Sequence, residues 1–95
     1  MIFTDTHTHL YAAEFDTDRE ELMKRAIDTG VSRFFLPNVE ASSVTPMLDL
    51  CERFPENCFP MMGLHPCSVK ENYLDELSLV ETELSNGNYV GVGEI

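Results

Sequence analysis

The chain has 95 residues, 43% of them hydrophobic, and its 17 acidic side chains outnumber 6 basic ones to give a net charge of −11. This length suits one small domain or a piece of a larger one, and no stretch approaches the roughly 20 apolar residues that span a membrane. A chain this acidic repels nucleic acids and anionic membranes through its mean field. Handling a phosphate substrate would therefore require another source of positive charge, such as bound metal ions.

The cysteines and the N-terminus indicate the cellular compartment. Cys51, Cys58 and Cys67 are an odd number and contain no CxxC pair, which argues against a disulfide framework and fits a reducing environment. We expect these thiols to act as small buried hydrophobic groups. The N-terminus has no basic segment followed by an apolar one, so we expect no signal peptide and a cytoplasmic protein.

The first two predicted elements are a strand and a helix. Residues 2–6 form a short apolar run that we interpret as a buried strand. Residues 15–30 carry a full set of helix signals. Thr17 and Glu20 have the spacing of a capping box, and Gly30 suits the position just after the last turn.

The rest of the chain continues the alternation. Residues 33–39 are bulky and apolar, which predicts a strand buried on both faces. A helix is predicted within 42–55, a strand at 58–63, a helix at 72–87 and a final strand at 89–95. The order is therefore β-α-β-α-β-α-β, with short connections and no low-complexity linker.

Strands that alternate with helices roughly 25–30 residues apart indicate a parallel sheet with right-handed crossovers. Two architectures have this order, an open doubly wound sheet and an arc of a (β/α)₈ barrel. No helix follows the last strand to cover it, and such a barrel needs about 250 residues. We therefore interpret residues 1–95 as a single segment, the N-terminal half of a barrel. Leu22 and Leu77 are expected to be buried on its helices.

The residues with metal-binding chemistry fall at strand ends. His7 and His9 are two residues apart, so an extended chain directs both imidazoles to one side. An isolated HxH pattern is weak evidence for a metal site. However, His65 follows the third predicted strand and Glu94 closes the fourth, and the C-terminal ends of parallel strands form one rim. Every histidine of the chain is thus predicted on that rim beside a carboxylate, which favours a metal site.

The motifs "DTHTHL", "GLHP" and "GEI" together resemble the TatD family of metal-dependent hydrolases. The resemblance covers the whole chain and implies a (β/α)₈ barrel that holds one or two divalent metals and hydrolyses phosphodiester bonds in DNA. By position, His7 and His9 resemble ligands of the first metal, and Glu94 resembles a carboxylate that binds or bridges the metals. His65 corresponds to a histidine that contacts the substrate phosphate, and Asp5 to a supporting residue behind the ligands.

The chain also departs from the family pattern, because members supply further histidines and an aspartate from later strands. We therefore expect the isolated segment to bind metal weakly and to be inactive. In the complete protein, two metals would activate a water for attack on phosphorus and neutralise the charge on the phosphate oxygens. The ligand types suit Mg, Mn or Zn about equally. The expected partner is DNA or another phosphodiester, with no membrane and no obligate protein partner.

Other functions remain open at this point. An amidohydrolase that cleaves C–N bonds would share the HxH pattern, although "GLHP" with "GEI" favours the nuclease branch. A non-catalytic fragment that self-associates through open sheet edges is a second alternative. A small doubly wound binding domain is disfavoured, because "THTHLY" contains no glycine with which to cradle a phosphate.

Three further residues have lesser roles in this interpretation. Tyr11 and Phe15 follow the histidine pair, and we expect them to anchor the loop rather than to stack on bases. Asn38 follows the second predicted strand, where it either faces the substrate or forms a turn.

Overall fold

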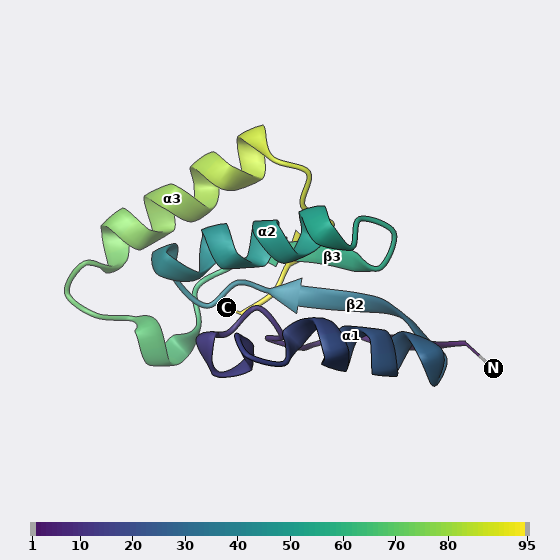
Figure 1. Ribbon diagram of the computed structural model, residues 1–95. Helices are drawn as coiled ribbons and strands as arrows, with labels where there is room; N and C mark the ends of the chain where they lie inside the picture. The colour runs from purple at the N-terminus through teal and green to yellow at the C-terminus, as the bar shows by residue number, and fades with distance from the viewer. Residues whose placement is uncertain (1, 95) are drawn as a thin grey trace.

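The structure is a computed structural model that describes residues 2–94, in which a four-stranded sheet is combined with three α-helices (Figure 1). The strands are β1 (Phe3–Asp5), β2 (Val31–Pro37), β3 (Cys58–Met62) and β4 (Gly91–Val92), and the helices are α1 (Arg19–Asp28), α2 (Val44–Arg53) and α3 (Tyr73–Asn86). Three short 3₁₀ helices lie in the loops, η1 (Ala13–Phe15), η2 (Ala41–Ser43) and η3 (Pro66–Ser68). The predicted alternation of strands and helices is confirmed.

The sheet has the order β1-β2-β3-β4, and each neighbouring pair of strands is parallel. An open doubly wound sheet would reverse its strand order at a switch point, whereas a barrel adds each strand beside the previous one. The helices α1 and α2 run alongside the strands on one face of the sheet, and α3 diverges from them (Figure 1). The chain is therefore a curled half-barrel, as predicted.

The core lies between β2 and the first two helices. Met23 of α1, Phe34 and Leu36 of β2, and Met47 and Leu50 of α2 are all fully buried. On the other face of the sheet, β2 is only partly covered. The expectation that this strand is buried on both faces is therefore wrong for that face, where the described chain provides no second layer.

The first strand also differs from the expectation, because β1 is exposed rather than buried. Ile2 and Phe3 are 78% and 49% exposed. Within residues 2–94, β1 pairs with β2 alone and forms one edge of the sheet, so its apolar side chains have little to pack against.

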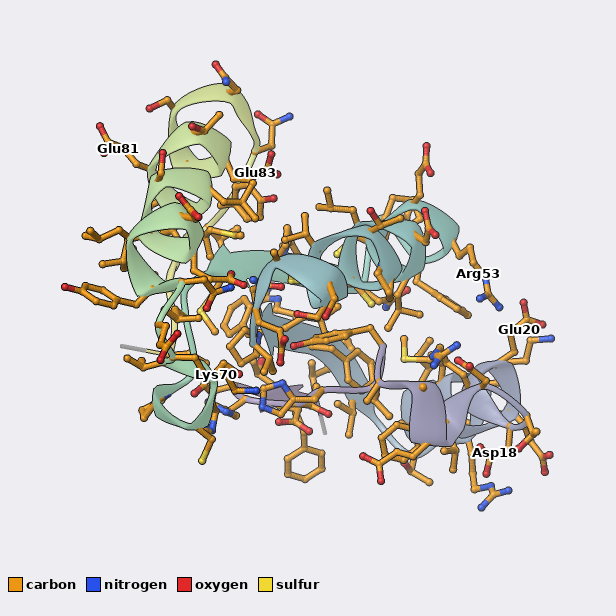
Figure 2. The ribbon with its side chains drawn as sticks, turned by 90° about the vertical axis from the view of Figure 1, so that its left-hand side faces the viewer. Asp18, Glu20, Arg53, Lys70, Glu81 and Glu83 are labelled. Atoms are coloured by element: carbon orange, nitrogen blue, oxygen red, sulfur yellow. The ribbon has the colours of Figure 1, made fainter. Side chains whose placement is uncertain are left out.

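The start of α1 corrects a second prediction. The helix begins at Arg19, and its N-cap residue, Asp18, makes no side-chain cap hydrogen bond. The predicted capping box of Thr17 and Glu20 does not form, and the Glu20 carboxylate instead pairs with Arg53 of α2 (Figure 2). An ion pair between two helices has replaced the local cap. Gly30 lies just after the helix with φ 110°, as its predicted role after the last turn requires.

The helix α3 packs less tightly than its sequence suggests. Leu77 is 49% exposed, so its predicted burial is wrong, and Leu22 on α1 is half-buried. The adjacent strand β4 has only two residues, so the sheet offers α3 little apolar surface to cover.

The cysteines only partly match the expectation. All three are free thiols, and Cys58 is buried and Cys51 half-buried, but Cys67 is exposed on η3. No helix within residues 2–94 has both the length and the apolar character needed to cross a bilayer.

Candidate metal centre

His7 and His9 lie just beyond β1, where the extended chain continues alongside β2. The backbone N–H of Thr8 donates to the carbonyl of Phe35 at 3.1 Å, and this contact prolongs the ladder past the end of the strand. The two imidazoles are directed to the same side, with ring centroids 5.0 Å apart and planes at 86°. The i, i+2 spacing thus places both side chains on one side, as expected for extended backbone.

Glu94 reaches the same rim from β4. The backbone N–H of Gly93 donates to the Met62 carbonyl, and that of Leu64 donates to the Glu94 carbonyl, both at 3.0 Å. Glu94 has φ 69°, in the left-handed region. A residue other than glycine pays about 1–3 kcal/mol for such a conformation, which is found most often at functional sites.

The two strand ends approach each other very closely at Gly63. A Cβ atom placed on Gly63 would lie 1.7 Å from the carbonyl oxygen of Gly93 and 2.5 Å from that of Glu94. Only glycine allows this approach. The chain thus holds Glu94 against the end of β3, and its side chain is only 7% exposed.

The three histidines of the chain all face the Glu94 carboxylate. Its Oε1 lies 2.7 Å from Nε2 of His7 and 3.6 Å from Nε2 of His9, and its Oε2 lies 3.5 Å from Nε2 of His65. The structure therefore brings together at one rim the four residues that the strand-end argument selected. A buried carboxylate is costly without partners, and the His7 imidazole, at 2.7 Å, is the nearest one here.

The donor atoms of His7, His9 and Glu94 fit a divalent metal ion. All of them lie within 4.8 Å of one another, and two imidazole nitrogens with a carboxylate oxygen are ordinary ligands of Zn, Mn and related ions. Burial, and next the neighbouring charge of His7, lower the pKa of His9, against an opposing effect of Glu94. Its imidazole is therefore kept in the neutral form that binds metals.

His65 differs from the other two histidines in the way its ring is held. Its Nδ1 accepts the backbone N–H of Cys67 at 3.0 Å, at the start of η3. A neutral imidazole that accepts at Nδ1 carries its proton on Nε2. The nitrogen that faces Glu94 is therefore a hydrogen-bond donor rather than a free lone pair.

Asp5 lies behind the pair of histidines at the end of β1. Its Oδ1 accepts the backbone N–H of His7 at 3.1 Å. The contact is to the backbone and not to the imidazole, so Asp5 can orient this turn of the chain but does not set the protonation of the ring.

Asn38 is a structural residue rather than a substrate-facing one. It is 1% exposed, its amide donates to the carbonyls of Gly63 and Glu40, and its Oδ1 accepts the Ser43 hydroxyl at 2.7 Å. The Glu40 carboxylate in turn accepts the hydroxyl of Ser68 on η3. This network joins the loop after β2 to the loop that carries His65, so the substrate-facing alternative is wrong.

Arg19 holds the loop after the histidine pair, a role that no pattern in the sequence predicts. Its guanidinium donates to the carbonyls of Leu10 at 2.6 Å, Tyr11 at 3.1 Å and Ala12 at 2.6 Å, and it pairs with Asp16 at 2.7 Å. These acceptors are seven to nine residues away in the chain. Local sequence patterns carry no signal for such a contact.

A parallel β/α arc with histidines and a carboxylate gathered at its C-terminal rim is the arrangement found in metal-dependent hydrolases built on (β/α)₈ barrels. Comparison with known families makes the assignment specific. The family model described as "TatD related DNase" matches residues 4–95. The chain therefore belongs to the TatD family.

Individual relatives agree with this assignment. YjjV of Escherichia coli, named a metal-dependent hydrolase, is 30% identical over 95 residues, and its crystal structure superposes on this chain with a TM-score of 0.76, covering 98% of this chain and 36% of YjjV. YabD of Bacillus subtilis, also named a metal-dependent hydrolase, is 27% identical, with 100% of this chain and 36% of YabD covered. The 3′-5′ ssDNA/RNA exonuclease TatD of Erwinia tasmaniensis is 26% identical, with 95% and 35% covered. The chain spans little more than a third of the length of these relatives.

Proposed function

We propose that this chain supplies the first part of the active site of a metal-dependent deoxyribonuclease that hydrolyses phosphodiester bonds. The observation that carries the proposal is the convergence of all three histidines on the buried Glu94 carboxylate. Membership of the TatD family and the exonuclease named among its relatives support DNA as the substrate. The complete protein is proposed to hold two divalent ions, with further ligands outside these 95 residues.

In this proposal His7, His9 and Glu94 would bind the first metal, and Glu94 would also contact a second. A bound divalent ion supplies an acidified water for the attack on phosphorus and positive charge for the phosphate oxygens. The protein contributes the position of the ligands. Asp5 holds the backbone at His7, and the tight approach at Gly63 holds Glu94.

His65 is proposed to contact the substrate phosphate rather than the metal. Its Nε2 carries the proton because Nδ1 accepts the Cys67 N–H. A protonated ring nitrogen cannot ligate a metal, but it can donate to a non-bridging phosphate oxygen that approaches the rim. In the present structure the Glu94 Oε2 atom lies 3.5 Å from this nitrogen.

Nuclease activity of the full protein tests the proposal. A 3′-ended single-stranded DNA should be cleaved in the presence of Mg, Mn or Zn, and Glu94→Gln should reduce the rate at least about 100-fold, because it removes a ligand charge without changing the side-chain shape. Glu81→Gln is the matched control, since Glu81 is an exposed acid on α3. Equal activity of the two variants would contradict the assignment of Glu94.

Two alternatives make different predictions in the same experiments. An amidohydrolase would cleave a cyclic amide, and metal-dependent activity on that amide with none on DNA would reject the nuclease. The exposed apolar residues of the edge strands, among them Phe3 and Val92, are the observation that favours a self-associating fragment. A discrete dimer that persists in a chelator, together with no hydrolysis by the full protein, would support that alternative.

A further inference from the structure

A short chain of hydrogen bonds lies directly behind His9, on the side of the ring away from Glu94. The Nδ1 atom of His9 is 2.9 Å from the hydroxyl oxygen of Tyr11, and that hydroxyl donates to the backbone carbonyl of Pro37 at the end of β2. The His9 and Tyr11 rings meet edge to face, with centroids 5.7 Å apart. Tyr11 is 3% exposed and belongs to the main core cluster.

The hydrogens available to these hydrogen bonds determine the tautomer of His9. A tyrosine hydroxyl has one hydrogen, and a carbonyl oxygen can only accept. Because the Tyr11 hydrogen is donated to Pro37, the contact between Tyr11 and His9 requires that the hydrogen lie on Nδ1 of His9. A neutral imidazole with its hydrogen on Nδ1 has a free lone pair on Nε2, the atom that faces Glu94.

The surroundings keep this arrangement fixed. A tyrosine phenol keeps its hydrogen at neutral pH, so the Tyr11 hydroxyl has one hydrogen to donate. The carbonyl of Pro37 cannot move freely, because Pro37 is fully buried within the sheet and paired with Met61. The core thus holds the Tyr11 hydroxyl in place behind the ring.

We propose that Tyr11 is a positioning residue that fixes His9 in the tautomer with its hydrogen on Nδ1, and thereby presents Nε2 to the metal. This inference rests on the proposed function in so far as a metal is bound. It also explains why two histidines on one rim differ, since a backbone N–H gives His65 the opposite tautomer. Substitution of a residue that orients a metal ligand in this way usually weakens metal affinity by about 10- to 100-fold.

The tautomer can be measured directly in the metal-free full-length protein. Long-range ¹H–¹⁵N correlation spectra at neutral pH distinguish a protonated from an unprotonated ring nitrogen. We expect His9 to show a protonated Nδ1 and His65 a protonated Nε2. A protonated Nε2 on His9 would overturn the proposal, and this test requires neither a variant nor any enzymatic activity.

A variant then tests whether Tyr11 is the cause. Tyr11→Phe should give His9 a mixture of tautomers and weaken Zn²⁺ binding about 10- to 100-fold, measured by calorimetry. Tyr73→Phe is the control, because that ring is exposed on α3, and it should leave both readouts unchanged. An unchanged His9 tautomer and Zn²⁺ affinity in a folded Tyr11→Phe would overturn the proposal. If Tyr11→Phe does not fold, the wild-type spectrum decides.

These measurements separate this proposal from the nuclease proposal. A protein that binds Zn²⁺ through His9 in the expected tautomer but cleaves no DNA would uphold the role of Tyr11 and reject the nuclease. Cleavage of DNA by a protein whose His9 carries its hydrogen on Nε2 would uphold the nuclease and reject the role of Tyr11.

Discussion

Replacing Gly63 by alanine should displace Glu94 from the site. An alanine Cβ would lie 1.7 Å from the carbonyl oxygen of Gly93, whereas real contacts of this kind do not fall below 3.0 Å. The ends of β3 and β4 must therefore separate by more than about 1 Å, a distance set by this overlap. The atoms in the way are backbone, so no side chain can rotate to relieve the clash.

This separation would affect both stability and the site. It would lengthen the hydrogen bond from Leu64 to Glu94, now 3.0 Å, and together with the steric strain it should lower the free energy of unfolding by about 2–4 kcal/mol. A ligand that moves by about 1 Å should also reduce the hydrolytic rate about 100-fold. The displaced carboxylate should in addition weaken Zn²⁺ binding.

Gly91→Ala provides the matched control for this prediction. A Cβ on Gly91 would meet only the Met61 sulfur, at 4.0 Å, which is ordinary van der Waals contact. Urea denaturation and Zn²⁺ titration of the two variants, both in the full protein, measure the effects separately. If Gly63→Ala unfolds at the same urea concentration as Gly91→Ala and binds Zn²⁺ equally well, the close approach of the strands does not position Glu94.

Four other substitutions should have distinct effects. His7→Ala should abolish cleavage, because it removes a ligand whose Nε2 lies 2.7 Å from the Glu94 carboxylate; full activity in an assay on DNA would refute its role as a ligand. Met23→Ala should cost about 2–5 kcal/mol in chemical denaturation, because Met23 is fully buried, and Leu77→Ala should cost clearly less in this chain. Arg19→Met should loosen the loop after His9, which faster amide hydrogen exchange of Tyr11 and its neighbours would show; unchanged exchange would contradict the anchoring role.

The sequence predicts which residues lie at the rim, because that prediction depends on strand direction alone. In a parallel sheet every strand ends at the same edge, so the positions of His65 and Glu94 relative to the histidine pair follow once the strands are located. The alternating β and α patterns locate them well enough. The position of Asn38 after β2 follows in the same way. Whether Asn38 faces a substrate or has a structural role depends on its contacts with Gly63 and Ser43, which the sequence does not show.

Other features depend on contacts between distant segments and could not be read from local patterns. The Thr17–Glu20 spacing is a valid capping signal, yet Glu20 pairs with Arg53, 33 residues away. The apolar spacing of α3 correctly predicts a helix, but burial of Leu77 depends on how much sheet lies beneath it. The sequence correctly predicts that Tyr11 anchors a loop. Its contact with His9 could not be predicted, because it depends on the Pro37 carbonyl at the end of β2, which holds the Tyr11 hydroxyl.

The net charge of −11 is compatible with a phosphate substrate because most of the acids do not act on the rim. Acidic side chains such as Asp18, Glu20 and Glu81 lie on or beside the helices (Figure 2), where they are exposed to solvent and screened by salt over about 8–10 Å. Glu94 is buried, and three imidazoles surround it. One divalent ion beside this carboxylate would reverse the local charge from −1 to +1. With the proposed metal bound, the field that a phosphate meets at the rim would therefore be set by the metal and its ligands, while the acids of the helices would determine the mean field farther out.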